Sequence, residues 1–157
     1  MTRAWHIGPR RFANSVRTGK GGLLAGGRWH RAGRPIVYTA DCLSLAALEI
    51  LARVRSVDNI DDLVAQPFDI GDAVSQDEIG TTRLPRHWDQ PIPLAATQNI
   101  GDQWLRDSRS AVLWVPSVHA ATQRNALLNP LHRDFQRIGI GKATPFRFDP
   151  RIRRRLA

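Results

Sequence analysis

The chain has few of the residues that form disulfide bonds or bind structural metal ions. Its single cysteine, Cys42, excludes a disulfide framework and any multi-cysteine metal site. The five histidines show no metal-ligand spacing, so we expect no metal. The longest unbroken apolar run is 111–115, far short of the roughly 18 apolar residues that span a membrane. The first five residues lack the apolar stretch of a secretory signal, and we expect a cytoplasmic protein.

What is present suits one folded domain. The 157 residues are 42% hydrophobic, too apolar for a disordered chain. A chain of this length buries roughly 70% of the surface that it exposes when unfolded. We find no linker long enough to divide the chain, so we expect a single domain over residues 1–157.

Acidic residues are absent from the first 40 positions, which carry a charge of +8. Residues 41–108 carry −7 and residues 109–157 again +8, for a formal net charge of +9. If the two basic ends meet in the fold, their field concentrates an anion such as a phosphate-bearing substrate, nucleic acid or an acidic protein. The alternative is a generally basic surface that keeps the protein soluble.

Short apolar and β-branched runs alternate irregularly with helical patterns. This irregularity indicates an α+β fold rather than a parallel βαβ arrangement. We predict helices over 44–55, 97–107 and 120–128, the last stopped by Asn129-Pro130. The predicted strands are 5–7, 35–39, 67–70, 111–115, 138–140 and 145–148.

The helix predicted over 44–55 has the clearest pattern. Ser44 or Asp41 is the expected N-cap. Its apolar face is expected to contain residues at three- and four-residue spacing, namely Leu45, Leu48, Leu51 and Ala52.

Common catalytic motifs are absent. Gly19-Lys20 lacks both the upstream glycine and the following Ser or Thr of a phosphate-binding P-loop. No Gly-x-Gly-x-x-Gly follows a strand, and no serine lies in a nucleophile elbow.

Four positions combine a suitable side chain with a suitable neighbourhood. Arg28 follows two glycines in Gly26-Gly-Arg-Trp-His30, where the backbone can approach a ligand and the guanidinium can grip phosphate or carboxylate; the alternative is a turn with a surface arginine. Tyr38, the only tyrosine, can stack on a heterocycle or lie half-buried in the core.

The other two positions carry oxygen atoms. Glu49 lies within an apolar helix, either as a functional acid or as a surface partner of Arg53. Ser117 directly follows a buried strand, where its hydroxyl can orient a catalytic carboxylate or a substrate, or cap the helix that follows.

Together with other strings in the same order, these positions resemble the RES domain family, the toxin half of bacterial type II RES-Xre toxin–antitoxin systems. The matching strings span nearly the whole chain and lie at 26–29, 35–39, 44–49, 100–105, 115–117, 125–130 and 148–151. The resemblance implies an ADP-ribosyltransferase-like α+β fold with mixed sheets and flanking helices, which binds and consumes NAD.

The resemblance also assigns roles to residues. It implies that Arg28 grips the ligand, Tyr38 lies beside the nicotinamide ribose, Glu49 is the catalytic acid and Ser117 assists, with Trp29 next to Arg28 in the NAD site. Two positions depart from the family pattern: Arg53 stands where a histidine is expected, and Gln123 where an acid is common. We expect these departures to affect helix packing or partner contacts.

The implied reaction cleaves the bond between nicotinamide and ribose. The acceptor stays open: water makes the enzyme a glycohydrolase, phosphate a phosphorylase, and a protein side chain an ADP-ribosyltransferase. The implied partner is an Xre-type helix-turn-helix antitoxin, through which the toxin contacts DNA only indirectly. The alternative is a non-catalytic basic nucleic-acid-binding module, which explains Arg151-Ile-Arg-Arg-Arg155 but not the acidic middle of the chain.

Overall fold

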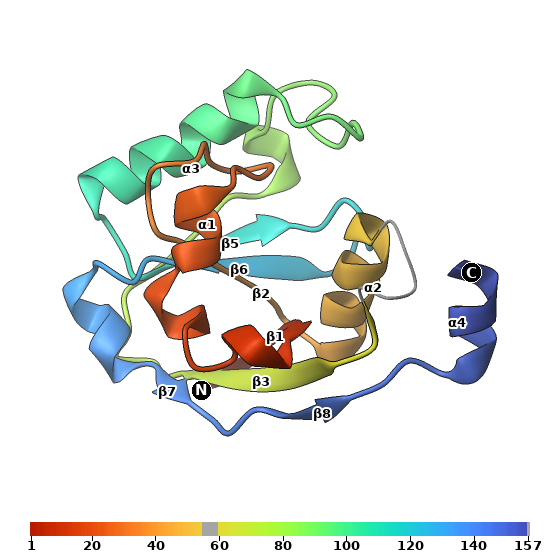
Figure 1. Cartoon of the computed structure of the whole chain (residues 1–157). Helices are drawn as coiled ribbons and strands as arrows, with labels where there is room; N and C mark the ends of the chain where they lie inside the picture. The colour runs from red at the N-terminus through yellow and green to blue at the C-terminus, as the bar shows by residue number, and fades with distance from the viewer. Residues whose placement is uncertain (55–59, 157) are drawn as a thin grey trace.

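A single curled sheet organises the chain and takes strands from both ends of the sequence (Figure 1). The computed structural model describes residues 1–54 and 60–156. The order of strands is β4-β5-β6-β2-β1-β3-β7, and β8 pairs with β3 off this path. The pair β4–β5 is parallel and the other pairs are antiparallel, so the sheet is mixed. The strands are β1 (Thr2–Pro9), β2 (Val37–Ala40), β3 (Leu63–Ile70), β4 (Gln76–Glu78), β5 (Val112–Pro116), β6 (Arg124–Leu128), β7 (Gly139–Ile140) and β8 (Thr144–Phe146).

Helices flank the sheet, which confirms the α+β prediction. They are α1 (Lys20–Leu24), α2 (Leu43–Arg53), α3 (Ala95–Asp107) and α4 (Pro150–Leu156). In Figure 1, α3 covers the β5–β6 side of the sheet, while α2 lies beside β1 and β2. Within the described ranges, no helix has the length and apolar character needed to cross a bilayer.

Strand β5 is buried on both faces because its side chains alternate between two apolar clusters. Val112 and Trp114 join a cluster with Phe135. Leu113 and Val115 point to the opposite face, into a cluster with Trp104 of α3. The strand predicted over 111–115 is confirmed, and its continuous apolar run is explained by cover on both sides.

Helix α2 confirms the clearest predicted helix, but its core-facing side is rotated from the expected one. Leu45 and Ala46 are buried, whereas Leu48 is 40% exposed and Ala52 is also exposed. The N-cap is Cys42, whose Sγ accepts a hydrogen bond from the Leu45 amide at 3.4 Å, so neither Ser44 nor Asp41 caps this helix. The helix ends at Arg53, and position 55 of the predicted range lies outside the described residues.

The helix predicted over 120–128 is wrong, because residues 124–128 form the strand β6. This strand lies between β2 and β5 and pairs with both, for example through Ala126 opposite Thr39 and Trp114. Two ladders of backbone hydrogen bonds therefore outweigh the local helical pattern. Sequence reasoning also missed β4, α1 in the glycine-rich stretch, and α4.

Strands β1 and β2 separate after a single bridged pair, Trp5 opposite Ala40. The His6 ring lies in the opening, with Nδ1 at 3.0 Å from the Tyr38 carbonyl oxygen. Because a carbonyl can only accept, Nδ1 carries the proton of this hydrogen bond. The sheet thus opens between β1 and β2, directly beneath α2.

Candidate active site

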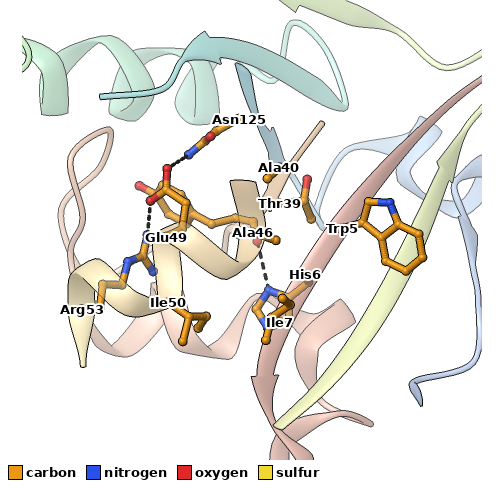
Figure 2. A pocket seen from close by; sticks show the side chains of 11 residues that line it. Trp5, His6, Ile7, Thr39, Ala40, Ala46, Glu49, Ile50, Arg53 and Asn125 are labelled. Carbon is orange, nitrogen blue, oxygen red and sulfur yellow. Dashed lines mark hydrogen bonds and ion pairs between the residues drawn. The ribbon is translucent and has the colours of Figure 1, made fainter. Parts of the chain in front are cut away.

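A small open pocket of about 50 Å³ lies where β1 and β2 separate (Figure 2). Residues of β1, β2, α2 and β6 line it, including Tyr38, Glu49, Arg53 and Asn125. Two of the four residues singled out from the sequence, Tyr38 and Glu49, therefore line the same pocket.

The two oxygen atoms of Glu49 have different surroundings. Oε1 accepts hydrogen bonds from Asn125 Nδ2 at 2.7 Å and from Ser117 Oγ at 3.3 Å. Oε2 lies 3.8 Å from Arg53 Nη2 and 3.6 Å from His119 Nε2. Figure 2 shows the carboxylate between Asn125 and Arg53. Glu49 makes the ion pair expected of a surface residue, yet its side chain is only 16% exposed and lies in a polar cluster.

The sheet register brings this cluster together. Ser117 follows β5 and Asn125 lies on β6, and the two strands are paired with Val115 opposite Asn125. Helix α2 packs across β1 and β2 and presents Glu49 to the same end of β6. The prediction that Ser117 can orient a carboxylate agrees with its hydrogen bond to Glu49.

Sequence reasoning assigned no role to Asn125 or His119. Asn125 is 8% exposed, and its Oδ1 has no hydrogen-bond partner among the described residues. A buried acceptor without a partner is costly, which indicates that a ligand or water donates to it. The sequence gives no sign of the role of Asn125, because the local pattern of residues 120–128 predicts a helix. No local sequence pattern points to His119. It lies in the loop after Ser117, where its backbone amide donates a hydrogen bond to Ser117 Oγ.

Arg28 lies close enough to Glu49 and Tyr38 to interact with them electrostatically. Its Nη1 donates to the Trp88 carbonyl at 2.6 Å and its Nη2 to the Gln90 carbonyl at 2.8 Å. Partial burial lowers the pKa of the Arg28 guanidinium below its ordinary value, and the charge of Glu49 opposes this effect. A guanidinium has five N–H donors, so Arg28 keeps three for a ligand.

Tyr38 presents its ring to the pocket and its hydroxyl to the interior. The hydroxyl oxygen lies 2.7 Å from His30 Nδ1, and burial raises the pKa of the phenol above its ordinary value. The Arg53 guanidinium lies over the ring, 5.7 Å from its centre. Arg53, where the sequence departs from the family pattern, thus contacts two site residues instead of acting only on helix packing.

The Trp29 side chain does not line the pocket. It is 2% exposed and packs in the cluster of Trp104, with its ring centre 6.0 Å from that of Trp88. This burial does not fit the predicted ligand contact, and Trp29 instead anchors the loop that carries Arg28.

The basic ends of the chain do meet in the sheet, but the acidic middle meets them there. Among the described residues, seven ion pairs join a basic end to the acidic middle: the Met1 amino group with Asp72, Arg3–Asp69, Arg10–Asp62, Arg31–Asp102, Arg109–Asp77, Arg124–Glu78 and Arg153–Asp61. These pairs neutralise part of the basic surface, while Arg53 lines the pocket and Arg28 interacts electrostatically with Glu49 and Tyr38.

Known proteins resemble this chain over nearly its whole length. The RES domain model matches residues 3–149. A relative named Toxin Res, from Photorhabdus laumondii subsp. laumondii, is 36% identical over 143 residues, which cover 90% of this chain and 91% of that protein. A relative named Prs ADP-ribosylating toxin, from Sphingobium sp. strain YBL2, is 32% identical over 158 residues and covers 98% of both proteins.

A solved structure extends the likeness to the fold. The M. tuberculosis MbcT–MbcA toxin–antitoxin complex contains a chain that matches with a TM-score of 0.65 at 13% identity. The match covers 99% of this chain and 88% of that one. It agrees with the expected mixed sheet and flanking helices. By the extent of the RES domain match and the identity of these relatives, the chain belongs to the RES domain family of toxins.

Proposed function

We propose that this toxin consumes NAD by cleaving the bond between nicotinamide and ribose. The observation that carries the proposal is the Glu49 carboxylate, held by Ser117 and Asn125 beside the Tyr38 ring in the pocket. The relative named as an ADP-ribosylating toxin supports NAD as the substrate. The RES domain match favours this function over a non-catalytic nucleic-acid-binding module.

Glu49 acts as the catalytic carboxylate in this proposal. Cleavage of the nicotinamide–ribose bond develops positive charge on the sugar, as in glycoside hydrolysis. A fixed carboxylate stabilises that charge without reorganising during the reaction. Oε1 is held by Ser117 and Asn125, so Oε2 is the oxygen that faces the ribose.

The other residues bind and orient the ligand. The pocket of about 50 Å³ is much smaller than a dinucleotide, so it receives only part of the nicotinamide ribose end, and the rest of NAD lies outside it. The orphan Oδ1 of Asn125 accepts from a ribose hydroxyl, and the Tyr38 ring lies against the ribose or nicotinamide. The remaining N–H groups of Arg28 donate to the pyrophosphate.

The acceptor is water, inorganic phosphate or a protein side chain, and all three share this first half of the reaction. The test measures nicotinamide release from NAD by the purified toxin, with and without phosphate. We expect Glu49→Gln to lower kcat by about 100-fold or more, since the stabilising charge is lost. The matched control is Glu78→Gln, which changes the chain's other glutamate in its exposed pair with Arg124.

Each outcome of this assay bears on the proposal. Release that depends on Glu49 supports NAD cleavage, and stimulation by phosphate identifies a phosphorylase. Unchanged release by folded Glu49→Gln removes Glu49 from the mechanism. No NAD binding, together with salt-dependent binding to arbitrary duplex DNA, overturns the proposal in favour of the nucleic-acid module.

We further propose that an Xre-type antitoxin neutralises this toxin by placing an acidic tail in the NAD site. The matched fold comes from a toxin–antitoxin complex, and the basic surface of this chain suits an acidic segment. The expected result is weaker NAD binding by the complex than by the free toxin. Equal NAD affinity for the two contradicts this mode of neutralisation.

A further inference from the structure

We propose that His30 is a positioning residue that holds the Tyr38 hydroxyl, so that Tyr38 contacts the ligand through its ring alone. The inference rests on the proposed function, because it concerns the same site. It is carried by the two hydrogen bonds of the His30 ring and by the loop that covers the Tyr38 hydroxyl.

The hydrogen bonds of His30 define where its protons lie. The side chain is 1% exposed, with Nε2 at 2.8 Å from the Gly22 carbonyl oxygen and Nδ1 at 2.7 Å from the Tyr38 hydroxyl. A carbonyl can only accept, so Nε2 carries a hydrogen. In a neutral imidazole this is the only N–H of the ring, so Nδ1 is bare and accepts a hydrogen bond from the Tyr38 O–H.

This arrangement commits the only hydrogen of the Tyr38 hydroxyl. The backbone of Gly27 lies directly over the same group, since a Cβ added there would be 2.8 Å from the hydroxyl oxygen. The hydroxyl is thus enclosed by His30 and Gly27, while the ring lines the pocket beside Glu49. Tyr38 consequently offers the ligand an aromatic surface and no hydrogen-bond donor.

His30 also fixes the loop that carries Arg28. The ring ties the loop to α1 through Gly22 and to β2 through Tyr38. The Gly27 amide donates to the His30 carbonyl at 2.9 Å, closing a tight turn around Arg28 and Trp29. Loss of the His30 ring should therefore loosen the grip of Arg28 on the ligand more than it slows bond cleavage.

A double-mutant cycle with NAD as the substrate tests this inference. We expect His30→Leu to raise KM for NAD about tenfold, with kcat changed by less than about threefold. Tyr38→Phe should raise KM in the wild type but cause no further loss in the His30→Leu background. His30→Asn should restore much of the loss, because its side-chain oxygen occupies the place of Nδ1. His87→Asn, at an exposed histidine with φ of 61°, is the matched control.

Two results of this double-mutant cycle would contradict the inference. If Tyr38→Phe lowers kcat/KM equally with and without His30, the hydroxyl acts on the ligand directly and the inference is overturned. Failure of His30→Asn to restore NAD affinity likewise contradicts a role for the Nδ1 acceptor.

Nitrogen-15 NMR of the histidine side chains gives a second test, which needs no turnover. Above neutral pH we expect His30 as the Nε2–H tautomer, assigned by its loss in His30→Asn. His6, which donates from Nδ1 to the Tyr38 carbonyl, should show the opposite tautomer. In Tyr38→Phe the His30 Nδ1 resonance should move to that of a nitrogen without a hydrogen bond.

An Nδ1–H tautomer at His30, or no response to Tyr38→Phe, overturns the inference even if His30→Leu does not fold. A wild-type protein without NAD turnover overturns the proposed function instead, while the NMR result still decides whether the His30–Tyr38 hydrogen bond exists.

Discussion

At the residue scale, the Glu49 carboxylate is held on one side only. Its Oε1 accepts from Asn125 and Ser117, whereas Oε2 faces Arg53 and His119 at distances too long for good hydrogen bonds. One oxygen is therefore fixed while the other stays available for chemistry. The Asn125 bond, at 2.7 Å, is the shorter of the two that fix it.

Asn125→Ala should lower kcat by about 10- to 100-fold, because a carboxylate freed from its donor is misplaced by a fraction of an ångström to an ångström. Steady-state kinetics with NAD measure the effect. Asn99→Ala, at an exposed position of α3, is the control and should behave like the wild type. A normal kcat in folded Asn125→Ala contradicts a positioning role for this amide.

His6 predicts how stability depends on pH. Burial lowers the pKa of His6 below its ordinary value of 6.5, partly opposed by the hydrogen bond to the Tyr38 carbonyl. Between the lowered folded pKa and about 6.5, the unfolded chain binds the proton that the folded chain excludes. The contribution of His6 to stability is thus complete above pH 6.5 and falls as the pH decreases, with a slope of at most about 1.4 kcal/mol per pH unit.

Urea unfolding at a series of pH values measures this slope. His6→Asn keeps a donor at the position of Nδ1 but does not titrate, so its stability should depend less steeply on pH in this range. Identical slopes for the two proteins show that His6 is not the responsible group.

At the element scale, the local sequence pattern and the pairing between strands compete to decide the secondary structure of a segment. The segment 120–128 has a helical pattern and ends at Asn129-Pro130, yet 124–128 pairs on both edges as β6. Helix α2 takes part in no strand pairing, and it forms the helix that its own sequence pattern predicts. The sequence therefore predicts α2 better than it predicts a central strand.

Helix α1 depends on two adjacent glycines in different ways. A Cβ at Gly22 would lie 2.2 Å from Ile36 Cγ2 and 2.8 Å from the Ile36 carbonyl oxygen, whereas Gly21 has nothing within 4 Å. Gly22→Ala should destabilise the protein by about 2 kcal/mol or more, because α1 must move away from the chain before β2. Gly21→Ala should stabilise it by up to about 1 kcal/mol, since alanine favours the helix.

Chemical denaturation of both variants measures the difference in the free energy of unfolding. Equal stabilities contradict the close approach of α1 to Ile36. Gly22→Ala should also raise KM for NAD, because the Gly22 carbonyl is the partner of His30.

At the scale of the whole molecule, neighbouring strands come from distant parts of the chain. Strand β1 pairs with β3, and β2 pairs with β6, more than 80 residues further on. The apolar clusters with Phe135 and with Trp104 share strand β5, and the ion pairs join the acidic middle to both basic ends. The sheet, the apolar clusters and the ion pairs therefore all depend on segments that are distant in the sequence.

The chain should therefore unfold in one cooperative transition, as expected of a single domain. Thermal melting followed by far-ultraviolet circular dichroism and by tryptophan fluorescence should give coincident curves. The five tryptophans lie on β1, β5, α3 and the loops around Arg28, so their fluorescence reports on two strands, a helix and the loops near the pocket. Two separated transitions contradict the single-domain prediction.

The sequence by itself determined the α+β class, the helix at 43–53 and the buried strand at 112–116, and it supplied the candidate residues of the proposed site. These follow from local periodicity and from short strings around Arg28, Tyr38, Glu49 and Ser117. Only the tertiary structure decided that 124–128 is a strand, that Trp29 is buried, and that Asn125 and His119 adjoin Glu49. The physical reason is that these features depend on the register between strands and on packing between residues 68 to 87 positions apart in the sequence. A local sequence pattern contains no information about such distant contacts.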